Sequence, residues 1–155
     1  MPSIGSAICE TTTEKLMRTA IDSNILSALF GLESTSEPLI ELLGRCRQEG
    51  AMVICGTVFA EVHAIPKMTP VLLDEFLADT GVSVDSAVSL AGWSAVGVAF
   101  SKYAVRRRAN GDGHPKRLLA DFAIGAHAAA SCDRLLTLDS ARYRTAFPKL
   151  NLLSI

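Results

Sequence analysis

Short apolar runs alternate with stretches of helical spacing along the chain. Candidate strands, short and rich in Val, Ile and Leu, lie at 18–22, 51–56, 81–85, 134–139 and 150–155. Candidate helices lie at 23–31, 37–50, 57–66, 69–79, 85–108 and 118–132, with a helical turn at 140–147. Parallel strands need long crossover connections, and helices supply them. The alternation therefore predicts an α/β fold, with a mostly parallel central sheet covered by helices on both faces.

Polar residues mark the expected ends of these elements. Ser23 and Thr57 are expected to cap the helices that begin there. The stretch 109–117 contains Gly, Asn and Pro, which predicts a loop. Residues 1–17 are rich in Ser and Thr and lack periodicity, so we expect a loose leader, followed by a single domain at 18–155.

The composition indicates a globular protein. Of 155 residues, 49% are hydrophobic and 20% are charged, which excludes disorder driven by charge. The net charge of -1 gives no overall attraction to nucleic acid or membrane, so such contacts must be local. The four cysteines form no C-x-x-C pair and are expected to be reduced thiols. Neither a signal peptide nor a membrane span is evident, so the expected location is the cytoplasm, without membrane contact.

Four carboxylates fall at equivalent places in the predicted sheet. Asp22 and Asp139 end candidate strands, Glu61 lies one turn into a helix, and Asp121 lies near the start of another. In parallel sheets such positions converge at the carboxyl edge, where reactive sites lie. Three of the acids also have a simpler interpretation, as a helix cap, a charge at a helix N-terminus or an Asx-turn. Glu61 lies four residues after Thr57, whereas a capping box requires three.

Four clustered carboxylates would repel one another unless a cation lay among them. Mg²⁺ and Mn²⁺ prefer oxygen ligands, and Mg²⁺ combines one or two carboxylates with water and substrate phosphate oxygens. Such a centre activates water and neutralises charge that develops on a phosphate. The pattern therefore predicts a site for a hard divalent cation.

Four segments of the sequence resemble the motifs of the PIN-domain ribonucleases, and within them the VapC-type toxins of bacterial toxin–antitoxin pairs. The segments are "AIDSNIL", "TVFAEVHA", "LLADFAIGAHA" and "LLTLDSARYRTAFPKLNLL", and the resemblance spans about residues 18 to 155. It implies a PIN-like three-layer α/β/α fold and a metal-dependent endoribonuclease. It also implies a homodimer and a small antitoxin as partner.

The resemblance assigns roles to individual residues. Asp22, Asp121 and Asp139 are expected to ligate Mg²⁺ or Mn²⁺, and Glu61 to orient or deprotonate the attacking water. Hydrogen bonds from Ser23, Asn24 and Thr137 are expected to steady these ligands. Arg142 is a candidate contact for an RNA phosphate.

A basic segment precedes the third motif. It contains Arg106, Arg107, Arg108, Lys116 and Arg117, which together could form an electropositive rim for RNA. A helix C-terminus and solvent also satisfy such side chains, and that simpler interpretation stays open for each of them. No role is assigned to the histidines, and Trp93, Phe100 and Tyr103 are expected in the core or in a dimer face.

Three other functions remain open. A haloacid-dehalogenase-like phosphatase also has an Asp after the first strand, but requires a second acid two residues later, where this chain has Asn24. A receiver-like signalling domain requires a Lys after a late strand, whereas Asp139 is followed by "SARYR". A PIN scaffold with weak catalysis could act only by binding RNA or protein. Divalent-metal dependence of RNA cleavage separates the nuclease from all three.

Overall fold

A computed structural model describes residues 15–31, 36–113 and 119–155. Within them five strands form one sheet in the order β3-β2-β1-β4-β5, and every neighbouring pair is parallel. The strands are β1 (Met17–Ile21), β2 (Gly50–Cys55), β3 (Ser83–Asp85), β4 (Arg134–Leu136) and β5 (Leu152–Leu153). The helices are α1 (Ser23–Phe30), α2 (Ser36–Glu49), α3 (Gly56–Val62), α4 (Pro70–Thr80), α5 (Leu90–Ala109), α6 (Leu119–Ser131) and α7 (Ser140–Arg144). The predicted α/β class with a parallel central sheet is confirmed.

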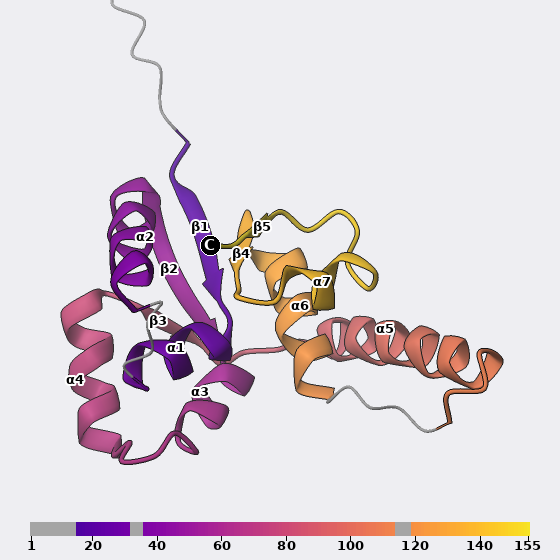
Figure 1. Cartoon of the computed structure of the whole chain (residues 1–155). Coiled ribbons are helices and arrows are strands. Elements are labelled where there is room, and N and C mark those ends of the chain that lie inside the picture. Colours follow the sequence, from indigo (N-terminus) through magenta and orange to yellow (C-terminus); the bar gives the residue numbers. More distant parts are fainter. Residues whose placement is uncertain (1–14, 32–35, 114–118) are drawn as a thin grey trace, which may run out of the picture.

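Helices cover both faces of the sheet. Figure 1 shows α1, α2 and α4 on one side of β1 and β2, and α5 and α6 on the other. Helix α3 follows the carboxyl end of β2, and α7 follows β4. The result is the three-layer arrangement expected when right-handed crossovers join parallel strands.

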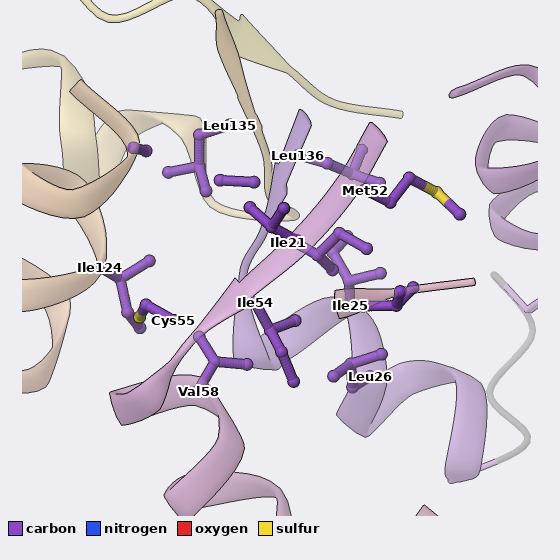
Figure 2. Packing of buried hydrophobic residues seen from close by; sticks show 14 of the residues in the cluster. Ile21, Ile25, Leu26, Met52, Ile54, Cys55, Val58, Ile124, Leu135 and Leu136 are labelled. Atoms are coloured by element: carbon purple, nitrogen blue, oxygen red, sulfur yellow. The ribbon is translucent and has the colours of Figure 1, made fainter. Parts of the chain in front are cut away.

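The core lies on both sides of the central strands. In β2 the last four residues, Met52 to Cys55, are all buried, as expected for a parallel strand covered on two faces. Figure 2 shows Ile124 of α6 beside Cys55, while Ile25 and Leu26 of α1 lie across the strands. Side chains alternate along a strand, so neighbouring residues of β2 contact helices on opposite faces.

The order of the strands creates a switch point between β1 and β4. The chain builds outward from β1 to β2 and β3, and then returns to place β4 on the other side of β1. Ile21 and Leu136 are register partners, and the backbone N–H of Asp22 donates to the Leu136 carbonyl at 2.9 Å. Crevices beyond the carboxyl ends of strands at such a point are where α/β sheets bind ligands.

Two expected helix caps are wrong. Asp22 and Cys55 occupy the N-cap positions of α1 and α3, so Ser23 lies inside its helix and Thr57 is the second residue of α3. The long helix predicted from residue 85 begins only at Leu90, because Asp85 belongs to β3 and Ser89 caps α5 through the Gly92 N–H. The boundaries move because tertiary pairing, rather than local propensity, decides where a strand ends.

Helix α5 extends away from the sheet. It packs against α6 around a second apolar cluster in which Phe100 and Tyr103 contact Phe122. Trp93 is about half exposed, and Leu90, Val98 and Val105 on the same helix are more exposed. A long part of α5 therefore presents apolar side chains to the surface.

The expected leader, the cysteines and a membrane span can be compared with the described residues. The predicted leader at 1–17 lies outside the described residues except for its last three, and Met17 already belongs to β1. Cys46 and Cys55 are buried free thiols and Cys132 is partly buried, whereas Cys9 lies outside the described residues. Among the helices of the described residues, none has the length and apolar character to cross a membrane.

Candidate active site

Asp22 is a buried carboxylate at the switch point, with only 2% of its surface exposed. Its Oδ2 accepts hydrogen bonds from the Thr137 hydroxyl at 2.7 Å and from the Tyr143 hydroxyl at 2.9 Å. Its Oδ1 has a longer contact, 3.5 Å, with the Ser23 hydroxyl, and the Ser23 backbone N–H also donates to this carboxylate. One oxygen is therefore held in place, while the other retains the capacity to bind a further partner.

The surroundings of Asp22 disfavour its negative charge. Burial raises the pKa of this carboxyl above its usual value of 3.8, and the nearby negative charge of Asp121 adds to the rise. Hydrogen bonds from Thr137 and Tyr143 act in the opposite direction but do not cancel the effect of burial. A cation beside Asp22 would restore the ionised form.

Thr137 connects the ends of β1 and β4. Its hydroxyl donates to Asp22 and in turn accepts from the Asn24 side-chain amide at 3.1 Å and from the Asp139 N–H at 3.1 Å. The Asn24 carbonyl oxygen accepts from the Leu138 N–H at 3.2 Å. These bonds tie the first turn of α1 to the loop after β4, so Asn24 and Thr137 have the supporting positions that the resemblance implies.

Asp121 and Asp139 are joined by Arg142. The guanidinium donates from Nη1 to Asp121 Oδ1 at 3.0 Å and from Nε to Asp139 Oδ2 at 3.1 Å. Burial opposes the charge of Arg142, but Asp121 and Asp139 outweigh it and raise the pKa of the guanidinium. Asp121 lies in the first turn of α6, and Asp139 caps α7 by accepting the Arg142 N–H at 3.2 Å. Asp139 therefore acts as a helix cap, as its simpler interpretation predicts, and it also binds the Arg142 side chain.

Glu61 has an unusual environment for an acid. Its Oε2 is buried and has no hydrogen-bond partner among the described residues. An unpaired buried carboxylate oxygen costs free energy unless a donor or a cation satisfies it. This oxygen could therefore accept a hydrogen bond from an ion-bound water or bind an ion directly.

Tyr143 completes the site and was not predicted. It is fully buried, and burial together with the charge of Asp22 raises the pKa of its phenol far above the usual range. Tyr143 therefore stays a hydrogen-bond donor at any physiological pH. The signal in the sequence is weak, because an aromatic residue four positions after Asp139 is equally typical of core packing.

The carboxylates do not form an ion cage in this conformation. Among residues 15–31, 36–113 and 119–155, no group of three or more His, Cys, Asp or Glu side chains is arranged to hold a metal ion. Arg142 accounts for part of this, because its guanidinium contacts both Asp121 and Asp139. The donors are nevertheless carboxylate oxygens, which a hard cation prefers, and Glu61 Oε2 is buried without a hydrogen-bond partner in the described ranges.

The basic segment lies mostly away from these acids. Arg106, Arg107 and Arg108 belong to the last turn of α5, and Figure 1 shows that this end of the helix points away from the sheet. Arg107 contacts Asp112 through the backbone carbonyl and the carboxylate. Lys116 and Arg117 lie outside the described residues. Of the expected phosphate contacts, only Arg142 adjoins the acids within the part of the chain that the structure describes.

His127, to which no role was assigned, has a structural partner. Its Nε2 lies 3.0 Å from Asp85 Oδ2, which also accepts from Arg18 at 3.2 Å. The hydrogen bond from His127 is the main cause that lowers the pKa of Asp85. These contacts fasten α6 to β3 and β1 and are separate from the acids around Arg142.

Comparison with known proteins locates the fold. The sequence matches no protein-family model and no curated protein. A chain of the crystal structure of VapBC2 from Rickettsia felis, bound to a DNA fragment from their promoter, has a similar structure, with a TM-score of 0.58 and 19% identity. The match covers 89% of this chain and 98% of that chain. The fold is PIN-like. In this fold Asp22 directly follows the central strand β1, and Asp139 lies three residues after the neighbouring strand β4, as the cap of α7.

Proposed function

We propose that this chain is a divalent-metal-dependent endoribonuclease and the toxin of a toxin–antitoxin pair. The observation that supports it best is Asp22, a buried carboxylate at the switch point of a PIN-like sheet, with one oxygen held by two hydroxyls and the other in a longer contact with Ser23. A buried acid at such a switch point, with its pKa raised by burial, is typical of a functional site rather than of a structural contact.

Mg²⁺ or Mn²⁺ would be held by Asp22, Asp121 and Asp139, directly or through water. When bound, the ion would polarise the RNA phosphate and lower the pKa of an attacking water. Thr137 and Tyr143 hold Oδ2 of Asp22 and so fix the rotation of its carboxylate, which would leave Oδ1 for the ion. Glu61, whose Oε2 has no hydrogen-bond partner within the described part of the chain, would orient the water and accept its proton.

The proposed substrate is RNA, recognised through its phosphate groups. Arg142 is the basic side chain that contacts the candidate ligands, and guanidinium groups bind phosphate in a bidentate manner. Arg106, Arg107 and Arg108 would contact RNA farther from the cleaved bond, because they lie at the far end of α5. Such contacts add affinity without sequence preference.

The proposed protein partners are an antitoxin and a second copy of the chain. The antitoxin rests on the structural likeness to a chain of the VapBC2 complex. The second copy rests on α5, where Leu90, Trp93, Val98 and Val105 are exposed apolar side chains. Burying such residues against a twofold-related helix is a common way to form a homodimer.

The decisive experiment measures RNA cleavage by the purified protein with Mg²⁺, with Mn²⁺ and with EDTA. Cleavage is expected only with the ion, and Asp22→Asn should lower it at least about 100-fold, since even residues that only support metal ligands cost 10- to 100-fold. Asp74→Asn, on the exposed surface of α4, is the matched control and should retain activity. Cleavage that survives EDTA, or equal rates for the Asp22 variant, would exclude the metal nuclease.

The same assay addresses the alternatives. A phosphatase of the haloacid dehalogenase type would release phosphate from small phosphate esters and leave RNA intact. In the structure Asn24 donates to Thr137 and accepts from Leu138, so it serves as a support at the place where that class needs an acid. A scaffold that only binds would retain RNA without cutting it.

A further inference from the structure

Arg142 contacts two of the proposed metal ligands at once. Its Nη1 lies 3.0 Å from Asp121, its Nε lies 3.1 Å from Asp139, and its backbone N–H donates to Asp139 as well. The Asp121 side chain is only 15% exposed, whereas Arg142 and Asp139 are about 40% exposed, at 38% and 43%. The guanidinium therefore bridges a less exposed acid, Asp121, and a more exposed one, Asp139.

The charges explain why a cation belongs there. Asp22, Asp121 and Asp139 would carry three negative charges, and the charge of Asp121 acts on the buried Asp22. A guanidinium shared by two carboxylates lowers their mutual repulsion. Among the described residues the neighbouring Arg144 has no ion pair with these acids, and its guanidinium donates to Ser140 Oγ at 3.5 Å.

We propose that Arg142 is the resting counter-ion of this site, and that a divalent cation must displace its guanidinium from Asp121 in order to bind. This inference rests on the proposed function, because it assumes that the acids hold a metal. Two cations cannot share the same carboxylate oxygen at contact distance without strong repulsion. Because Arg142 is partly exposed, its side chain can move outward from Asp121 while it keeps its contact with Asp139. The displaced guanidinium is then beside the acids, where a phosphate would arrive.

Competition and positioning predict opposite effects of removing the arginine. If Arg142 only orients Asp121 and Asp139 for the metal, its loss weakens metal binding. If Arg142 competes with the metal, its loss strengthens metal binding, since the ion no longer has to break a charged contact. The sign of one measured change therefore separates the two roles.

The test is a calorimetric titration of Mn²⁺ into the full-length wild-type protein, Arg142→Gln, Arg142→Lys and Arg144→Gln. We expect Arg142→Gln to lower the dissociation constant for Mn²⁺ about tenfold, within the usual range of coupling between two sites. Arg142→Lys keeps the charge but loses the fork that spans two carboxylates, so it should bind Mn²⁺ a few times more tightly than wild type. Arg144→Gln lies on the same helix outside this network and should stay within about twofold of wild type.

A second readout uses the melting temperature. Without metal, Arg142→Gln leaves the acids without their counter-ion and should melt below wild type; with saturating Mn²⁺ its gain in melting temperature should exceed that of wild type. If Arg142→Gln does not fold, Arg142→Lys provides the comparison.

Three results would overturn the inference. In the first, the wild type binds Mn²⁺ and cleaves RNA, but the folded Arg142 variants bind Mn²⁺ no more tightly than it does. That result would exclude the competing role of Arg142 and leave the proposed function standing. An equal change in Arg144→Gln would show a general charge effect instead. Absence of Mn²⁺ binding in all four proteins would remove the proposed function together with this inference.

Discussion

At the scale of single residues, the negative charge of Asp22 would serve metal binding, but its burial lowers the stability of the folded state. In the unfolded chain its carboxyl titrates at the usual pKa of 3.8, and folding raises that pKa through burial. The folded state therefore binds the proton more strongly. It follows that the free energy of unfolding falls as the pH rises from about 4 through the raised pKa, and stays lower above it.

Asp22→Asn should therefore stabilise the metal-free protein at neutral pH while abolishing RNA cleavage. The amide oxygen still accepts from Thr137 and Tyr143, and the charge that burial disfavours is gone. A gain of about 1 kcal/mol is expected, which is within the range that single stabilising substitutions commonly give. Chemical denaturation with EDTA at pH 7 measures it. A variant clearly less stable than wild type would show that Asp22 is held mainly as a structural acceptor.

Tyr143 acts on Asp22 through a single hydrogen bond that lowers the pKa of the carboxyl. In Tyr143→Phe that bond is lost, so the pKa of Asp22 rises further and the ionised form appears only at higher pH. The acid limb of the pH–rate profile for RNA cleavage should shift to higher pH. Stability should fall by about 1 kcal/mol, the usual net value of one hydrogen bond. An acid limb at the same pH in both proteins would show that another group controls it.

At the scale of elements, the contact between α6 and the chain after α7 sets where Asp121 meets Arg142. Gly125 lies in the middle of α6, and a Cβ there would collide with the ring of Phe147. Phe147 packs against both apolar clusters, so its ring has little room to move. The glycine is required by this close approach, not by its backbone angles.

Gly125→Ala should consequently push α6 away from Phe147 and separate Asp121 from Arg142. A loss of about 1–3 kcal/mol is expected, the typical cost of overfilling a core, together with slower RNA cleavage. Gly97→Ala on α5 is the control: nothing lies within 4 Å of its added Cβ, and the helix should gain about 0.5–1 kcal/mol. Urea denaturation of both variants measures the difference, and equal stabilities would contradict the assigned contact.

At the scale of the whole molecule, the exposed apolar side of α5 is the feature that the isolated chain leaves unexplained. Only Val96 of its twenty residues is buried, although the helix is rich in Ala, Val and aromatic side chains. A soluble chain that displays such a surface normally covers it with a partner.

Val98→Glu should convert a homodimer into a monomer. Val98 is 54% exposed on α5, and a charge there would be buried without a partner in a twofold interface. The control is Val71→Glu on α4, where the valine is 66% exposed. Light scattering after gel filtration should give twice the 16.5 kDa chain mass for wild type and for the control, and one chain mass for Val98→Glu. A monomeric wild type would rule out the dimer.

The sequence by itself determined the class of fold and placed Asp22 directly after β1 and Asp121 in the first turn of α6. It misplaced Asp139, which caps α7 three residues after β4, and Glu61, which lies near the end of the short helix α3. The class of fold and the places of Asp22 and Asp121 follow from local patterns: strand length and helical spacing reveal the alternation, and parallel strands bring their carboxyl ends to one edge. It did not determine the caps of α1 and α3 or the start of α5, because these depend on which strand residues pair and where pairing stops.

Only the tertiary structure decided how the acids are satisfied. Tyr143 donates to Asp22 and Arg142 joins Asp121 to Asp139, while Glu61 keeps one oxygen without a partner among the residues that the structure describes. The physical reason is that burial and hydrogen bonding depend on side chains far apart in sequence; Asp22 and Tyr143, for example, are separated by 121 positions. No periodicity records such a contact, because it exists only once β1 and β4 lie side by side.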